Sequence, residues 1–156
     1  MFGFKKGQGA SEYLILLAVV LIIGIIAVAL LGGFSDIGAG AREKEARQYW
    51  AGAVRPFTIQ DWAQKGTVFS LTIKNNEPYK LVITNITISN VSYAPSGGLS
   101  FAGGGVKTIS ISGFNACNQT TFDYFEYPVV ITYSSSDISG KVQKGEKPLV
   151  GPCQVQ

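Results

Sequence analysis

The sequence contains no histidine, and it holds only two cysteines and one methionine. Without histidine, Ser-His and Cys-His nucleophile pairs and most zinc sites are excluded. Charge is also sparse, because charged residues make up 15% of the chain and the net charge is only +3. Lys5 and Lys6 supply two of those positive charges, so no clustered basic face remains to indicate a nucleic-acid partner.

Two other patterns that could indicate an enzyme are incomplete. The glycine-rich segment at 103–108 lacks the adjacent Gly-Lys-Ser/Thr and the spacing of a phosphate-binding loop. The carboxylates Asp123, Glu126 and Asp137 are scattered over a strand-like region, whereas general acid–base catalysis needs positioned groups. We therefore predict no catalytic residue, no metal site and no cofactor, and we interpret the protein as something other than an enzyme.

Charge is absent altogether from one long apolar run, residues 13–31. Nineteen residues in a helix extend about 28 Å, which is close to the thickness of a bilayer's hydrocarbon core. Lys5 and Lys6 precede the run, and positive charge there keeps a segment on the cytoplasmic side. The chain after the run is rich in Ser, Thr and Gly. These features predict one membrane-length helix that carries one outward-facing domain.

Three interpretations of the N-terminus compete. A secretory signal has an apolar stretch of roughly 7–15 residues followed by a cleavage site; the run is longer, and the candidate site would be at residues 39–41. A plain single-pass anchor accounts for the run and the lysines, but it gives Glu12 no role. A precursor that is cut before the run accounts for all of these features.

The segment Lys-Lys-Gly-Gln-Gly-Ala-Ser-Glu-Tyr-Leu at 5–14 resembles the class III signal peptide of archaeal type IV pilins, particularly those of methanogens. In that family a prepilin peptidase cuts between Gly and Gln. The resemblance therefore implies cleavage between Gly7 and Gln8. Glu12 is then the fifth residue of the mature chain, where the family carries its glutamate. The resemblance covers residues 5 to about 31, and beyond them it concerns architecture only.

The chemistry of these residues supports the same interpretation. Cleavage before the run leaves the helix attached and creates an ammonium group at Gln8, about one helical turn from Glu12. A carboxylate in the first turn of a helix also faces the positive end of the macrodipole. At an apolar boundary it is costly unless it is paired or near water. Glu12 could therefore register a subunit against a neighbour's Gln8 ammonium; the alternative is that lipid headgroups solvate it.

The chain divides into four predicted segments: a cleaved leader at 1–7, an apolar transmembrane or filament-core helix at 8–33, an amphipathic helix continuation at 34–62, and an extracellular β-rich domain at 63–156. Tyr49 and Trp50 belong to the apolar stripe of the amphipathic part, and we expect them to contact the β-rich domain. We predict an α+β fold, in which a long N-terminal helix packs on a small antiparallel β-sheet head.

Alternating apolar residues predict the strands of that head. The alternation changes parity within the second strand, which predicts a bulge near residues 83–85. The residues at 61–64 are expected to add a helical turn. The predicted strands are 68–74, 80–92, 107–112, 125–133 and 138–142.

Cys117 and Cys153 both lie in the outward-facing part of the chain. In an oxidising compartment they can form a disulfide, which would stabilise a small core by roughly 3–4 kcal/mol in the chain-entropy model. The alternative is two free thiols. We predict the disulfide, because both cysteines lie in loop-like sequence with no other metal ligand beside them.

Three Asn-X-Ser/Thr triplets are candidate N-glycosylation sites, with Asn85, Asn90 and Asn118 as the acceptors. On the predicted strand Asn85 points away from its apolar neighbours and therefore outward. The alternative is that a sequence rich in Ser and Thr produces such triplets by chance.

The resemblance implies a structural subunit of an archaeal type IV pilus that serves surface attachment. Such a protein is inserted in the membrane, cut by a prepilin peptidase, and passed to pilus assembly machinery in the membrane. It then polymerises with copies of itself into an extracellular filament, whose heads contact surfaces or other cells. Two alternatives stay open: a single-pass anchored extracytoplasmic binding module, and a minor pilin or archaellin-like subunit.

Overall fold

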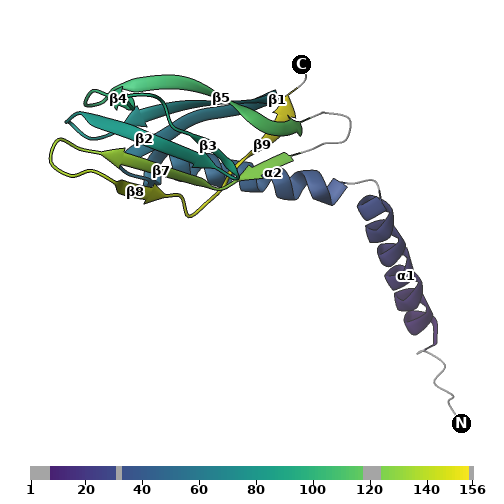
Figure 1. The fold of residues 1–156 in the computed structure, drawn as a ribbon. Helices are drawn as coiled ribbons and strands as arrows, with labels where there is room; N and C mark the ends of the chain where they lie inside the picture. Colours follow the sequence, from purple (N-terminus) through teal and green to yellow (C-terminus); the bar gives the residue numbers. More distant parts are fainter. Residues whose placement is uncertain (1–7, 31–32, 118–123, 155–156) are drawn as a thin grey trace, which may run out of the picture. The chain divides into compact units, whose positions relative to one another are not determined.

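The computed structural model describes residues 8–30, 33–117 and 124–154 (Figure 1). The chain forms two compact units, Met1–Gly38 and Ala39–Gln156, and the second is the head. Helix α1 (Gln8–Leu30) lies in the first unit. Helix α2 (Gly33–Gln48) crosses the boundary between the units in sequence and is followed by a π-helical turn, η1 (Tyr49–Ala53).

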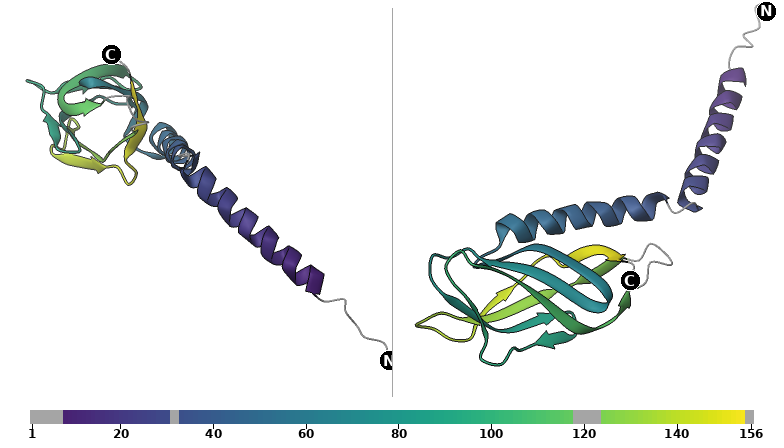
Figure 2. Two further views of the ribbon diagram at one scale, coloured as in Figure 1. Left: turned by 90° about the vertical axis from the view of Figure 1, so that its right-hand side faces the viewer. Right: turned by 90° about the horizontal axis from the view of Figure 1, so that it is seen from above.

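The head consists mainly of two β-sheets that curve around a common interior (Figure 2). Among the described strands, every pair is antiparallel except β1 with β9, which is parallel. The first sheet has the order β5 (Val106–Cys117), β1 (Phe57–Asn75), β9 (Leu149–Gln154) and β6 (Tyr124–Tyr127). The second has the order β3 (Val91–Tyr93), β2 (Leu81–Ile88), β7 (Val129–Ser134) and β8 (Lys141–Lys144), and β4 (Leu99–Phe101) also pairs with β2.

Aromatic side chains join the two sheets in the core of the head. Phe57 of the first sheet meets Tyr133 of the second edge to face, with ring centroids 5.4 Å apart. Within the first sheet, the fully buried Phe69 lies 5.3 Å from the ring of Phe114 and 5.2 Å from that of Phe125. Edge-to-face pairs stabilise a core by about 0.5–1.5 kcal/mol beyond their burial. The core therefore depends on contacts between residues far apart in the sequence.

Trp50 attaches the helical segment to the head, as the sequence predicts. Its side chain is fully buried, and its indole Nε1 donates a hydrogen bond to the carbonyl oxygen of Lys147 at 2.9 Å. The hydroxyl of Tyr49 accepts a hydrogen bond from the backbone N–H of Glu146 at 2.8 Å. A Cβ atom on Gly145 would lie only 2.2 Å from the Trp50 ring, so this close approach requires glycine.

Ion pairs add to this attachment at its surface. Arg42 of α2 contacts Glu126 at 3.0 Å, and Lys147 contacts Glu45. Arg47 contacts Asp61 at 3.1 Å and also lies over the ring of Trp62. Exposed pairs of this kind contribute about 0–1 kcal/mol each, so they orient the helix more than they hold it.

The predicted α+β fold, with one long helix on a small sheet, is wrong. The structure has two shorter helices, and most of the head is β-strand in two sheets. The helical residues end at Ala53, and β1 begins at Phe57, so the predicted helix at 34–62 is too long. Glycine disfavours helix by about 1 kcal/mol per position, and in the sequence Gly32 lies between α1 and α2 while Gly33 is the first residue of α2.

The residues at 61–64, expected to add a helical turn, belong instead to β1. Trp62 and Gln64 are buried, whereas Asp61 and Lys65 are exposed, so burial follows the two-residue period of a strand. The sequence hides this pattern because one of the inward positions carries a polar glutamine. Its buried amide is explained by hydrogen bonds described below.

The strand predicted at 125–133 is in fact two strands that belong to different sheets. Its apolar alternation is correct, since Phe125, Val129 and Ile131 are all buried. However, β6 pairs with β9 and β7 pairs with β2 and β8, and Pro128 separates them. Proline has no N–H to donate to a ladder, so it commonly marks a break in a strand.

The strand predicted at 80–92 is a hairpin. Strands β2 and β3 are joined by Ser89 and Asn90, and Ser89 has a positive φ of 51°. The predicted bulge is confirmed, because the register of β2 against β7 shifts between Ile83 and Asn85. The last predicted strand is displaced, since β8 begins at Lys141 and Ile138 is exposed in the turn before it.

Candidate functional site

Helix α1 presents apolar side chains on all sides. Its span Ser11–Val28 is long enough and, despite Glu12, apolar enough to cross a membrane, and none of this span is buried by the rest of the structure. Apolar surface of this extent needs lipid or other protein around it. This apolar N-terminal helix fits a membrane span and a signal anchor equally.

The predicted processing site adjoins the start of α1. The helix begins at Gln8, the residue that cleavage would make N-terminal, while Gly7 lies outside the described residues. Glu12 has an exposed side chain and follows the first turn, which contains no acidic residue. Because the macrodipole acts mainly within the first turn, its effect on Glu12 is weaker than the sequence suggests. Pairing between Glu12 and a neighbouring ammonium stays a prediction.

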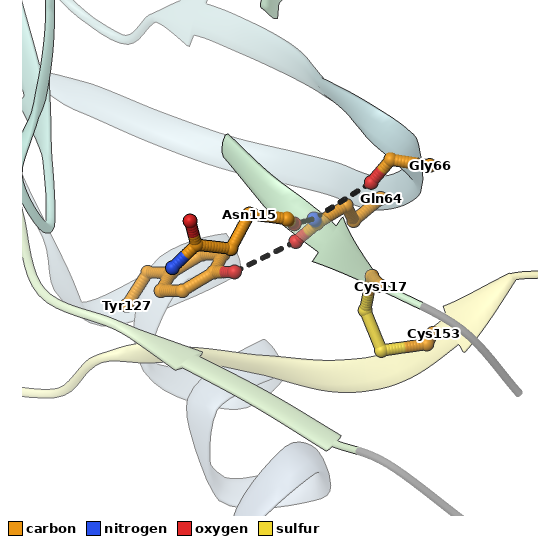
Figure 3. The surroundings of a disulfide bond; sticks show 6 residues. All are labelled: Gln64, Gly66, Asn115, Cys117, Tyr127 and Cys153. Atoms are coloured by element: carbon orange, nitrogen blue, oxygen red, sulfur yellow. Dashed lines mark hydrogen bonds between the residues drawn. A yellow bond between two sulfur atoms is a disulfide. The ribbon is translucent and has the colours of Figure 1, made fainter. Parts of the chain in front are cut away.

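The predicted disulfide is confirmed. Cys117 at the end of β5 is bonded to Cys153 in β9, with a Cα–Cα distance of 5.3 Å (Figure 3). Both strands flank β1, where Gly66 pairs with Cys117 and Gln64 pairs with Cys153. The bond therefore spans the middle of β1 and ties the C-terminal strand to β5.

Gln64 occupies the centre of this region, and the sequence analysis did not single it out. Its buried side-chain Nε2 donates hydrogen bonds to the carbonyl oxygens of Gly66 at 3.0 Å and Asn115 at 2.8 Å. Its Oε1 accepts a hydrogen bond from the hydroxyl of Tyr127 at 2.9 Å (Figure 3). One glutamine thus satisfies groups on β1, β5 and β6, as a buried amide must.

Tyr127 is held in place by this contact. Partial burial raises the pKa of its hydroxyl, and the hydrogen bond to Gln64 lowers that pKa by a smaller amount. The pKa therefore lies above its ordinary value, and the hydroxyl stays protonated and donates to the glutamine near neutral pH.

Two of the predicted glycosylation triplets share one cluster of hydrogen bonds. Asn85 Nδ2 donates to Thr87 Oγ1 at 3.2 Å, and Ser92 Oγ donates to Asn85 Oδ1 at 3.1 Å. The hydroxyls of Thr87 and Ser92 are themselves 3.1 Å apart and hydrogen-bonded. Thr87 is the hydroxyl residue of the Asn85 triplet, and Ser92 is that of the Asn90 triplet. We call Asn85, Thr87 and Ser92 the amide–hydroxyl cluster.

The three predicted acceptors differ in their surroundings. Asn85 is only half-exposed, and its amide is engaged in the amide–hydroxyl cluster. Asn90 is exposed in the two-residue turn between β2 and β3. Asn118 lies outside the described residues. Of the two described acceptors, Asn90 is therefore the one whose amide is presented at the surface.

In the part of the chain that the structure describes, no group of three His, Cys, Asp or Glu residues could hold a metal ion. The carboxylate of Glu126 is paired with Arg42, and Asp137 is exposed in the turn before β8. No protein-family model matches the sequence, and no match was found among curated proteins. The functional interpretation therefore rests on the geometry above and on the residues at the start of α1.

Proposed function

We propose that this protein is a type IV pilin-like filament subunit that polymerises through α1 and displays its head outside the cell. The observation that supports the proposal most is the complete exposure of the apolar span Ser11–Val28. An apolar helix can leave the bilayer only if equivalent apolar surface replaces the lipid, and copies of the same helix supply such surface. In this proposal lipid surrounds α1 before assembly and neighbouring subunits surround it afterwards, so α1 does not need to be buried by its own chain.

The head has the features expected of a domain on the outer side of a membrane. Its disulfide between Cys117 and Cys153 is stable in oxidising compartments and uncommon in the cytosol. Lys5 and Lys6 precede the apolar helix, and this favours an outward position for everything after it. We propose that such heads, exposed along a filament, serve attachment to surfaces or other cells.

In this proposal the precursor is cut between Gly7 and Gln8 by a prepilin peptidase. The new ammonium group at Gln8 and the carboxylate of Glu12 then provide opposite charges at the start of α1. In an apolar bundle, helices can slide along one another at little cost in free energy. One ion pair between neighbouring subunits is therefore enough to select the register of their helices. The remaining partners are the membrane-embedded assembly machinery and further copies of the chain.

Mass spectrometry of the mature protein, together with electron microscopy of the cell surface, tests the proposal. A chain that begins at Gln8 and is found in filaments is the expected result. The Gly7→Val variant is expected to remain uncut and to form no filaments, while the matched leader variant Gly3→Val is cut normally. A mature protein that begins at Met1 and stays in the membrane would instead support an anchored binding module.

The abundance of the chain in purified filaments separates the remaining alternatives. A chain that forms most of the filament mass is a major pilin. A chain present at a few copies per filament is a minor pilin. Rotation of a filament built mainly from this chain would instead identify an archaellin-like subunit.

A further inference from the structure

A polar hollow of about 220 Å³ opens beside Asn90 on the surface of the head. The turn between β2 and β3 forms one wall, and the segment Gly113–Asn115 of β5 forms another. Tyr127 of β6 completes the lining. Ligand pockets for drug-sized molecules usually enclose about 300–1,000 Å³, so this hollow suits a single small ring.

None of the residues that line the hollow is charged. A phosphate or carboxylate ligand would find no cation to neutralise it there, whereas a neutral ligand with several hydroxyl groups needs only donors and acceptors. Asn90 and Asn115 have exposed amide side chains, which can donate and accept at the same time. The half-buried Tyr127 contributes aromatic surface on which the apolar face of a sugar ring can pack, and the buried Phe114 packs against the Tyr127 ring. The chemistry of the lining is therefore that of a saccharide site.

The hollow is held open by the backbone and by Gln64. Gly113 has a φ of 105°, a conformation that residues with a Cβ rarely adopt, so no side chain at that position can fill the space. Gln64 binds the Tyr127 hydroxyl and the backbone of Asn115 together (Figure 3). Both residues are thus fixed before any ligand arrives, which reduces the entropic cost of binding.

We infer that this hollow is a saccharide-binding site that seats the first sugar of a glycan carried by Asn90. Asn90 is one of the residues that line the hollow, so a sugar attached to its side chain starts beside it. Asn85 offers no comparable position, because its amide is engaged in the amide–hydroxyl cluster. The inference rests on the outward location of the head in the proposed function.

The attachment is a group transfer from a lipid-linked oligosaccharide by an oligosaccharyl transferase. A bond forms between Asn90 Nδ2 and C1 of the first sugar, and the bond between C1 and the phosphate oxygen of the lipid carrier breaks. The amide loses one proton to a base of the transferase, and the carrier leaves with the bonding electron pair. The seated sugar would then shield the Gly113–Asn115 backbone and the turn at Asn90 from water.

Hydrogen exchange on the full-length protein purified from its own cells tests the inference. We expect the backbone amides at 113–115 to exchange about tenfold more slowly when the glycan is present than after its removal. A tenfold change is the size expected if the seated sugar adds one or two net hydrogen bonds. Asn115→Ala should keep the glycan mass and lose this protection, because only the seating contact is removed. Ser110→Ala, on the same strand but outside the hollow, should keep both mass and protection.

A second arm uses Asn90→Gln protein with N-acetylglucosamine or galactose added at millimolar concentration. Protection that appears only with added free sugar would assign the hollow to an external saccharide and overturn the seating of the protein's own glycan. Absence of protection in both arms would overturn the saccharide site. A glycan-free Asn90 in the native protein would also overturn the inference, and electron microscopy would show independently whether filaments form.

Discussion

The side-chain amide of Gln143 makes both backbone hydrogen bonds of Phe57. Its Oε1 accepts from the Phe57 N–H at 3.0 Å, and its Nε2 donates to the Phe57 carbonyl oxygen at 2.7 Å. Gln143 lies in β8 of the second sheet, whereas Phe57 begins β1 of the first. The side chain thus takes the place of a neighbouring strand and joins the two sheets at an edge of the core.

Gln143→Leu is expected to destabilise the head by about 2–6 kcal/mol, because it leaves two buried backbone groups unpaired at roughly 1–3 kcal/mol each. Thermal unfolding of the full-length protein in detergent measures the loss. The control is Gln60→Leu, which changes an exposed glutamine on β1 and should shift the midpoint little. Equal midpoints for Gln143→Leu and the wild type would show that water satisfies the Phe57 backbone.

Loss of the disulfide should destabilise the head by roughly 3–4 kcal/mol in the chain-entropy model. The Cys153→Ser variant and the reduced wild type are expected to unfold at similar denaturant concentrations, both below the oxidised protein. Adding reductant to Cys153→Ser is the control and should change nothing further. An unchanged midpoint on reduction would mean that the parallel pairing of β9 with β1 holds the C-terminal strand in place without the disulfide.

Asn85 and Asn90 should respond in opposite ways to substitution. Asn85→Ala removes two hydrogen bonds of the amide–hydroxyl cluster and should cost about 1–2 kcal/mol without changing the glycan mass at Asn90. Asn90→Ala should remove a glycan while leaving the stability of the unglycosylated chain nearly unchanged, since its side chain is exposed. Intact-mass measurement and denaturant unfolding give the two readouts, and a lost glycan in Asn85→Ala alone would reverse the assignment.

Glu12→Ala is expected to abolish most filaments while expression, cleavage before Gln8 and membrane insertion stay normal. The reason is that a neighbour's ammonium is left without its partner in a poorly hydrated bundle, which can cost several kcal/mol. Glu12→Gln should give an intermediate yield, since it keeps an acceptor but loses the charge. Glu45→Ala, which removes an exposed ion pair of the head, is the control and should assemble normally. Wild-type yield from Glu12→Ala would favour the plain anchor.

Stability should fall at alkaline pH, in part through Tyr127. Burial raises the pKa of Tyr127 in the folded protein. The contribution of this shift to the free energy of unfolding is therefore complete below the unfolded pKa of about 10, and it is lost as the pH rises through the folded pKa. Tyr133 has a raised pKa as well, through burial and the nearby Tyr79 and Glu77. Tyr127→Phe should therefore show a smaller alkaline decrease in unfolding midpoint than the wild type. If the unfolding midpoint of Tyr127→Phe fell with pH as steeply as that of the wild type, Tyr127 would be excluded as a cause of the alkaline loss of stability.

Local patterns in the sequence predicted several features correctly. Alternation located most of the strands, and its change of parity located the bulge between Ile83 and Asn85. The apolar stripe placed Trp50 against the head, and the two cysteines predicted their bond. The alternation and the stripe depend on a residue's own side chain or on neighbours a few positions away, and the bond was predicted because the sequence has only two cysteines to pair. Such short-range physics can be read from the order of residues.

Other features were decided only by the tertiary structure. Pro128 divides one apolar run between two sheets, and Gln64 and Gln143 are buried because distant groups complete their hydrogen bonds. The hollow beside Asn90 likewise needs three separate strands and the turn between β2 and β3. The sequence by itself determined the apolar helix, the alternation and the candidate acceptors, since these follow from local composition. Pairing partners and buried polar networks required the fold, because their energies come from groups that only folding brings together.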